Sequence, residues 1–261
     1  QFLYFIGRNV MSEAAEATPF PTKAIVIPEM TLGAFDTNNF DFCDERWYHE
    51  AAEIVRDFGV PVSLKAFPDL DHARADTWVS HLLSLGLDEK TLVICHGVGA
   101  ACLFRALTDA PDVRVGGVIV IAGSDTDLED DNLRATGFFY APLDFPLIRS
   151  RCGWVAVAGA EDDPYATVEV QARVAELLES DFVVFGTGLH LEAPSEAGEL
   201  LDFLRDTLRL HHGEGRPRPD DDGLPRGAAR AAASPAANGE PDEGAADGSA
   251  KKNPCMPCVV M

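Results

Sequence analysis

The sequence predicts an α/β fold, in which a mostly parallel sheet carries helices on both faces. Short apolar runs typical of buried strands alternate with segments of helical periodicity along most of the chain. The run from Val115 to Ala122 is apolar throughout, as in strands that are covered on both sides. Such alternation is typical of βαβ units, whose strands lie parallel. At 261 residues, the chain is long enough for one sizeable core.

Runs rich in apolar and β-branched residues predict six strands, at 23–28, 60–67, 92–95, 115–122, 153–159 and 181–185. Pro28 ends the first strand, because proline cannot donate to a sheet. Apolar residues that recur three and four positions apart predict helices at 47–58, 76–85, 101–107, 167–178 and 196–210. Gly59 is a typical stop for the first helix. Loops are expected at the acidic stretch 125–131 and at 186–190.

The stretch from Thr91 to Ala101 has the layout of a nucleophile elbow. An apolar run ending at Cys95 predicts a strand, a tight turn follows, and a helical pattern begins directly afterwards. In the Gly-x-Ser-x-Gly template, this strained turn lifts one side chain above the sheet. Cys95 stands at the first glycine, Gly99 at the last, and Gly97 where the serine belongs. We therefore expect the geometry of the elbow without its reactive atom.

Two further polar features follow predicted strands, the pair Asp162-Asp163 and His190. Ligand sites in parallel sheets gather at the carboxyl ends of the strands, so we expect both to lie close to Gly97. The chain order of elbow, acid and histidine is that of an α/β-hydrolase.

Residues 23–210 resemble the small α/β-hydrolases of the retinoblastoma-binding protein 9-like serine hydrolase family. Besides the elbow, the resemblance rests on short motifs spread along this segment. These are Trp47-Tyr48, Phe67-Pro68-Asp69, Ala73-Arg74 with Trp78, the loop from Ser124 to Tyr140, Asp162-Asp163-Pro164 and Gly188-Leu189-His190.

The resemblance implies a Ser-His-Asp triad in active members of that family. Matched by position, Asp163 is the acid, His190 is the base, and Gly97 is at the nucleophile position. Active members also have a Pro-Gly-x-Gly loop after the first strand, which helps to form the oxyanion hole. This chain has Pro28-Glu29-Met30-Thr31 there, and Gly33 comes later.

Both departures predict a catalytically inactive member. Nucleophilic acyl transfer needs an oxygen or sulfur within reach of a base, and Gly97 offers neither. Loss of a triad nucleophile costs on the order of a millionfold in turnover. A carboxylate at Glu29 would repel a developing oxyanion. From the sequence alone, we expect the substitutions at Gly97 and Glu29 to be two independent losses within one site.

The sequence offers three other candidate sources of activity, which are Cys95, Ser124 and the pair of His190 with Asp163. Cys95 is expected inside a strand as a small buried hydrophobe, and Ser124 is expected to have a loop role. His190 with Asp163 could activate a water directly, although a hydrogen bond left over from an ancestral site is favoured. An active esterase or peptidase that uses water or a non-standard nucleophile is therefore the main alternative.

No cofactor or metal is predicted. The spacing Asp125-x-Asp127-x-Glu129 suggests a calcium loop, but Asp130 and Thr136 stand where an EF-hand has glycine and glutamate. A solvated acidic loop is favoured. The glycines at 97, 99, 116 and 117 do not form a dinucleotide fingerprint.

Charge and cysteine usage restrict the partners. A net charge of −22 argues against nucleic acid, because phosphate binding needs a basic surface. Six scattered cysteines and the lack of an evident secretory signal favour a reducing cytosol. Residues 1–22 are expected to be a lead-in, with Met11 as one candidate for the true first residue.

The C-terminal segment has a different composition. Residues 211–250 are rich in Gly, Pro, Ala and charged residues, which predicts a disordered linker. Residues 251–261 end in Cys-Val-Val-Met, a C-a-a-X motif that predicts a prenyl group on Cys258. Cys255 is a candidate palmitoylation site. The tail resembles those of Ras-class small GTPases, and a zinc or redox pair or an unmodified tail are the alternatives.

Electrostatics make a lipid anchor necessary if this protein binds a membrane. The tail from residue 211 carries −2 of the net charge of −22, which leaves −20 on the rest. An anionic leaflet repels such a body, and Lys251 and Lys252 contribute only roughly 1 kcal/mol each near the surface. We therefore expect a binding or scaffold module on the cytosolic face of a membrane, with an unknown small-molecule or protein ligand in the ancestral pocket. A soluble protein with an incidental tail is the other alternative.

Overall fold

A computed structural model of the protein describes residues 19–31, 46–64, 67–191 and 197–212. Within these residues the chain forms six strands and seven helices. The strands are β1 (Lys23–Ile27), β2 (Val62–Ser63), β3 (Thr91–His96), β4 (Val115–Ile121), β5 (Cys152–Ala160) and β6 (Phe182–Phe185). The helices are α1 (Tyr48–Asp57), α2 (Ala75–Ser84), α3 (Val98–Asp109), α4 (Asp131–Thr136), α5 (Phe145–Ser150), α6 (Val168–Leu177) and α7 (Gly198–His212).

The six strands form one sheet in the order β2-β1-β3-β4-β5-β6, and every neighbouring pair is parallel. The predicted α/β fold is therefore confirmed. The order reverses direction between β1 and β3, which places the carboxyl ends of these two central strands side by side. Their register pairs Ile27 with Cys95, so the segments after β1 and β3 leave the sheet next to each other.

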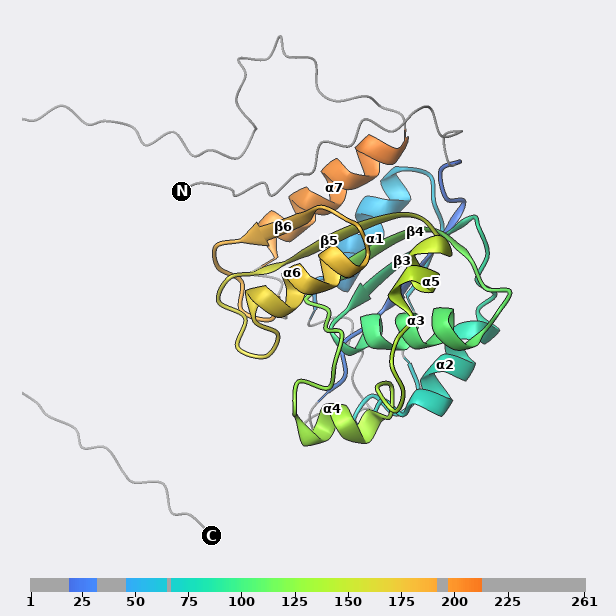
Figure 1. Ribbon diagram of the computed structural model, residues 1–261. Coiled ribbons are helices and arrows are strands. Elements are labelled where there is room, and N and C mark those ends of the chain that lie inside the picture. The colour runs from blue at the N-terminus through green and yellow to red at the C-terminus, as the bar shows by residue number, and fades with distance from the viewer. Residues whose placement is uncertain (1–18, 32–45, 65–66, 192–196, 213–261) are drawn as a thin grey trace, which may run out of the picture. The chain divides into compact units, whose positions relative to one another are not determined.

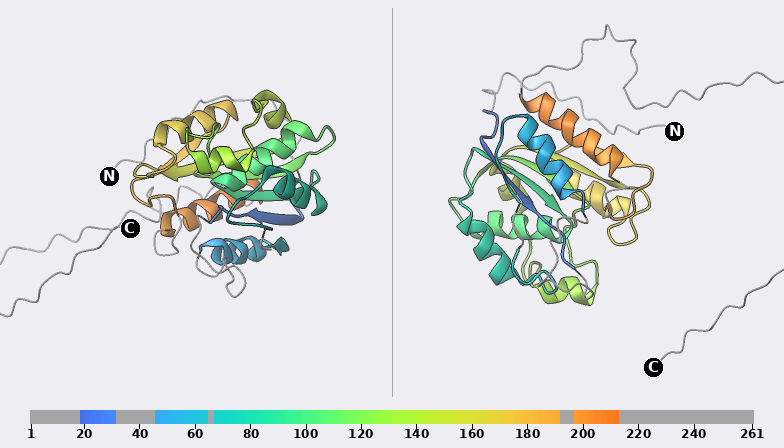
Figure 2. Two further views of the ribbon diagram at one scale, coloured as in Figure 1. Left: turned by 90° about the horizontal axis from the view of Figure 1, so that it is seen from below. Right: turned by 180° about the vertical axis from the view of Figure 1, so that it is seen from behind.

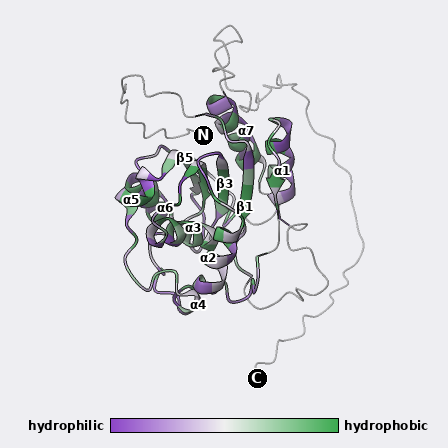
Figure 3. Cartoon of the chain, turned by 90° about the vertical axis from the view of Figure 1, so that its right-hand side faces the viewer, coloured by the Kyte–Doolittle hydropathy of each residue, from purple (hydrophilic) through white to green (hydrophobic). Residues whose placement is uncertain are grey.

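Helices cover both faces of the sheet, as Figures 1 and 2 show. Helices α1 and α7 pack together on one face, and α2, α3, α5 and α6 lie on the other. Strands β3 and β4 are buried along their whole length, which agrees with their unbroken apolar sequences. In Figure 3 the strands are mainly hydrophobic, whereas the helices carry both hydrophobic and hydrophilic residues.

The observed elements differ from the predicted ones most clearly at three places along the chain. The second strand was expected over 60–67, but β2 covers only Val62–Ser63 at the sheet edge, where it pairs with β1 alone. Two short helices, α4 and α5, lie between β4 and β5 and were not predicted. Helix α7 continues to His212, two residues beyond its expected end.

Several predictions fall on parts of the chain outside the described residues. These are most of the lead-in, nearly all of the linker at 211–250, and the tail with Cys255 and Cys258. Among the described helices, none is both long and apolar enough to span a membrane.

Candidate active site

The elbow is formed at the carboxyl end of the central strand. Strand β3 ends at His96, helix α3 begins at Val98, and Gly97 joins them with φ +46° and ψ −113°. This backbone conformation favours glycine and strains other residues. Gly99 has a packing role, because a Cβ there would lie 2.6 Å from the carbonyl oxygen of Ile27. Glycine thus lets α3 approach β1 closely.

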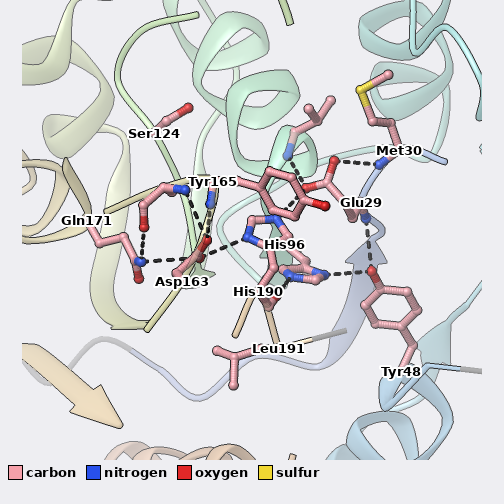
Figure 4. Close-up of polar contacts among 12 residues, drawn as sticks. Glu29, Met30, Tyr48, His96, Ser124, Asp163, Tyr165, Gln171, His190 and Leu191 are labelled. Carbon is pink, nitrogen blue, oxygen red and sulfur yellow. Dashed lines mark hydrogen bonds and ion pairs between the residues drawn. The ribbon is translucent and has the colours of Figure 1, made fainter. Parts of the chain in front are cut away.

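Asp163 and His190 lie beside the elbow, so the structure brings together the three positions that the sequence indicated. Asp163 follows β5, and its Oδ2 atom lies 2.9 Å from Nδ1 of His190. The Oδ1 atom of Asp163 accepts hydrogen bonds from the backbone N–H groups of Tyr165 and Ala166, at 2.8 and 3.0 Å. Both side chains are buried. The acid and the imidazole have the mutual orientation that a triad requires (Figure 4).

The carboxylate of Glu29 lies against the elbow at Gly97 and faces His190, whose side chain is drawn beside it in Figure 4. Its Oε2 atom accepts a hydrogen bond from the Val98 backbone N–H at 2.8 Å and lies 3.3 Å from Nε2 of His190. Its Oε1 atom accepts from the backbone N–H of Met30 at 2.7 Å. In α/β-hydrolases, the N–H after the nucleophile and an N–H from a neighbouring loop form the oxyanion hole. Glu29 occupies both donors that stand at these places.

A side chain at position 97 would require the end of the Glu29 side chain to move away from the elbow. A Cβ atom built on Gly97 would overlap Oε2 of Glu29 and lie 3.0 Å from Nε2 of His190. The expectation of two independent losses is therefore wrong. The two substitutions are sterically coupled, because the carboxylate takes the volume that the serine side chain would need.

His190 is held as an imidazolium between two carboxylates. Burial lowers its pKa, but the hydrogen bonds and negative charges of Asp163 and Glu29 outweigh burial and raise the pKa to about 10. Both ring nitrogens face carboxylate oxygens, and only the charged form can donate from both. At neutral pH, His190 therefore has no free nitrogen with which to act as a base.

A second set of hydrogen bonds supports the Glu29 backbone and the His190 loop. The N–H of Glu29 donates to the hydroxyl of Tyr48 at 2.9 Å, and that hydroxyl lies 2.8 Å from Nδ1 of His96. Nε2 of His96 lies 2.8 Å from the carbonyl oxygen of His190. Burial holds the pKa of His96 well below its usual value, so the ring is neutral, with Nε2 donating and Nδ1 accepting. This chain links the ends of β1 and β3 to the histidine loop.

The loop around His190 is strained and held at two points. Leu189 and Leu191 both have positive φ, at 48° and 56°. The N–H of Leu189 donates to Asp162 at 2.8 Å, and the indole N–H of Trp47 donates to the carbonyl of Leu191 at 2.5 Å. Asp162 therefore fixes the loop, whereas its neighbour Asp163 contacts the imidazole.

Gln171 of helix α6 contacts the carboxylate of Asp163. Its Nε2 atom lies 3.3 Å from Oδ2 of Asp163 and also donates to the carbonyl of Ala166. The side chain lies over β5 where Gly159 has no Cβ that would obstruct it. Gln171 thus satisfies the remaining acceptor capacity of Asp163.

The other candidate residues lie apart from this site. Cys95 is buried in β3 and its Sγ contacts the carbonyl of Ile119 at 3.5 Å, while burial raises its pKa far above the usual value. Ser124 donates to the carbonyl of Thr126 and makes no contact with the triad residues drawn in Figure 4. Neither side chain has a hydrogen bond to Asp163 or His190 among the described residues.

The acidic stretch has partners within the protein. Asp125 forms an ion pair with Arg173 at 2.8 Å, and Asp127 pairs with Arg134 at 3.0 Å. Asp130 caps helix α4 by accepting from the N–H groups of the next turn. In the part of the chain that the structure describes, no group of three or more His, Cys, Asp or Glu side chains is arranged to hold a metal ion.

The sequence places the Glu29 carboxylate near the oxyanion hole and includes Tyr48 in a motif, but it does not predict the contacts of either side chain. His96 and Gln171 are not singled out by the sequence. The pattern carries no signal for these contacts, since they depend on the distance between chain segments in the folded sheet. The parallel pairing of β1 with β3 brings Glu29 to the elbow.

Comparisons with known proteins indicate the family and the fold of the chain. The sequence signature of a family described as serine hydrolase matches residues 44–203. The serine hydrolase RBBP9 of Rattus norvegicus is 29% identical over 189 residues, which cover 72% of this chain and 96% of the rat protein. The ydeN gene product of B. subtilis has a similar structure, with a TM-score of 0.62 at 18% identity over 73% of this chain and 98% of its own. Est1E from Butyrivibrio proteoclasticus has a TM-score of 0.52 at 12% identity, over 74% and 89% of the two chains.

Proposed function

This chain belongs to the serine hydrolase family, and from that premise we propose that it is a catalytically inactive member that works as a lipid-anchored binding or scaffold module. The observation that carries the inactive part is the Glu29 carboxylate, which accepts hydrogen bonds at the place of both the nucleophile and the oxyanion. Acyl transfer needs that space for an attacking oxygen and for the substrate carbonyl.

Three parts of the hydrolytic machinery are disabled together. Gly97 supplies no attacking atom. The N–H groups of Met30 and Val98 are engaged by Glu29, so they are not available to a substrate oxygen. His190 is protonated at neutral pH, because its pKa is raised to about 10 after the effects of burial, Asp163 and Glu29 are combined.

The last point also argues against hydrolysis by an activated water. A general base must accept a proton at the operating pH. The Nδ1 and Nε2 atoms of His190 already carry protons that face Asp163 and Glu29. A water molecule therefore finds no acceptor on the imidazole.

The anchoring part of the proposal rests on the C-terminal sequence. The C-a-a-X motif at residues 258–261 supports a prenyl group on Cys258, and Cys255 is the candidate for a second acyl chain. One prenyl chain gives only marginal membrane binding, so the second lipid matters for stable attachment. The folded body would then bind a small-molecule or protein partner close to a membrane.

Fluorophosphonate labelling of the full-length wild-type protein tests inactivity. We expect no adduct on residues 91–101, measured by peptide mass spectrometry, with an active serine hydrolase labelled in parallel as the control. An adduct within that stretch would refute the inactive reading. It would leave the anchoring part of the proposal untouched.

Membrane fractionation tests the anchor separately. Wild type and Cys258→Ser are expressed in a prenylating cell, and we expect wild type in the membrane fraction and the variant in the supernatant. Cys255→Ser should show intermediate partition if the second lipid is present. Equal partition of wild type and Cys258→Ser would reject the anchor.

A further inference from the structure

We infer that Glu29 is an intramolecular ligand of a preserved acyl-binding site, and that Glu29 and Gly97 act as one interlocked pair whose joint reversal restores a serine hydrolase site. The inference rests on the proposed inactivity and concerns the same site. The ligand that it assigns to that site is the carboxylate group, which Glu29 itself supplies.

The first support is the match between Glu29 and a bound acyl group. The two carboxylate oxygens take the two backbone donors, with Oε1 on Met30 N–H at 2.7 Å and Oε2 on Val98 N–H at 2.8 Å. The second donor stands at the start of α3, a helix of 12 residues whose N-terminus favours negative charge. The donor set is therefore intact and correctly aimed, and it is filled by the protein's own carboxylate.

The second support is that the elbow keeps the backbone of an active site. Gly97 retains φ +46° and ψ −113°, although glycine does not require a strained turn. A Cβ at this position would lie 3.0 Å from Nε2 of His190, which is tighter than an ordinary contact, so the imidazole must shift by a few tenths of an ångström. A serine introduced here would thus lie beside its base once the Glu29 side chain is removed and the imidazole has shifted.

The third support concerns the base. Asp163 keeps its hydrogen bonds to His190 and to two backbone N–H groups without any contribution from Glu29. Removing the Glu29 carboxylate takes away one of the two groups that raise the pKa of His190. The imidazole then moves toward its ordinary pKa and becomes able to accept a proton. Glu29 therefore affects three parts of the site. It takes the space of a nucleophile, it occupies the two oxyanion donors, and it raises the pKa of the base.

The experiment compares five full-length proteins with a fluorophosphonate probe: wild type, G97S, E29G, E29G/G97S and E29Q/G97S. In the labelling step, the introduced serine oxygen attacks phosphorus, an O–P bond forms, and the P–F bond breaks with release of fluoride. The hydroxyl proton passes to Nε2 of His190 and then to solvent. Glutamine keeps the volume of Glu29 without its charge, so E29Q/G97S separates the steric effect from the electrostatic one.

We expect an adduct on the peptide containing position 97 only in E29G/G97S, with at least a hundredfold more label than in G97S or E29Q/G97S. Labelling of G97S at the level of the double variant would overturn the interlock while leaving the inactivity of wild type intact. Labelling of wild type would instead refute the proposed function.

Thermal unfolding keeps the inference falsifiable if labelling is weak. The interlock predicts that G97S melts at a lower temperature than wild type, and that adding E29G raises the melting temperature of G97S. A double variant that is unfolded or less stable than G97S contradicts the interlock. A folded double variant without label contradicts the preserved site.

Discussion

The Glu29 carboxylate lies 3.3 Å from Nε2 of His190, on the side where a triad serine would stand. On the opposite side, Asp163 lies 2.9 Å from Nδ1. Both ring nitrogens therefore face a carboxylate, whereas the base of an active triad must leave one nitrogen free for the nucleophile. His190, Asp163 and Glu29 form a buried charged cluster, whose properties can be measured without a substrate.

The stability of the protein should fall as the pH rises above neutrality. The pKa of His190 is raised from 6.5 to about 10 in the folded state, after burial is outweighed by Asp163 and Glu29. A raised folded pKa contributes stability that is complete below about pH 6.5 and is lost as the pH approaches 10. The loss is at most about 1.4 kcal/mol per pH unit in this window. Urea unfolding at pH 7, 8 and 9 measures it.

The control for this pH dependence is His190→Gln, which removes the titrating group. Other groups titrate between pH 7 and 9 in both proteins, so the difference between their unfolding curves isolates His190. Nitrogen chemical shifts of the imidazole at pH 8 give a direct check, with both nitrogens expected to be protonated. A variant with the same pH slope as wild type would contradict the paired imidazolium.

Asp163 should matter more for stability than its neighbour Asp162. Asp163→Asn turns an acceptor of two backbone N–H groups and an imidazolium into a partial donor at a buried site. Removing one member of a buried ion pair costs about 3 to 5 kcal/mol, and we expect a loss at the lower end of that range. Asp162→Asn is the matched control, because its exposed side chain accepts only the Leu189 N–H and asparagine keeps that acceptor. Denaturant unfolding that gives equal losses would refute this assignment.

The sheet and the elbow could be predicted from sequence because their signals are local. Apolar runs and helical spacing depend on neighbouring residues, and the order of elbow, acid and histidine can be read along the chain. Helix α5 also had a local signal, since Asp144 caps it and Pro146 lies in its first turn. Asp130 at the start of α4 is a similar cap, which was interpreted as part of an acidic loop.

The position of the Glu29 carboxylate in the site could not be predicted from local signals. Glu29 and Gly97 are 68 positions apart, and each substitution taken alone indicates a simple loss. Their steric coupling depends on where the Glu29 side chain turns after β1, which the Tyr48 hydroxyl helps to fix through the Glu29 N–H. A contact of this kind becomes visible only in three dimensions.

The Tyr48 hydroxyl should contribute to stability through its two buried hydrogen bonds. Tyr48→Phe leaves the Glu29 N–H and Nδ1 of His96 without their partner, at a site that excludes water. An unsatisfied buried polar group costs about 1 to 3 kcal/mol, and we expect a loss in that range. Tyr140→Phe is the control, because this exposed tyrosine donates only to Asp109 at the surface, and its removal should cost under about 0.5 kcal/mol. In thermal unfolding, Tyr48→Phe should therefore melt at a clearly lower temperature than Tyr140→Phe. Similar melting temperatures would contradict the hydrogen bonds that join Glu29, Tyr48 and His96.

A side chain at position 159 should destabilise the protein as long as Gln171 is present. A Cβ at position 159 would overlap Oε1 of Gln171. The Gln171 side chain is buried, and its Nε2 atom contacts Asp163. Gly159→Ala must displace this side chain from a packed site, at a cost of about 1 to 3 kcal/mol. In a Gln171→Ala background the obstacle is gone, so the same substitution should cost much less, and a double-mutant cycle measures the difference.

Gly198→Ala is the control, since a Cβ at the start of α7 meets no atom within 4 Å and alanine favours the helix. A Gly159→Ala cost that persists without Gln171 would show that the glycine is needed for a reason other than the space that Gln171 occupies.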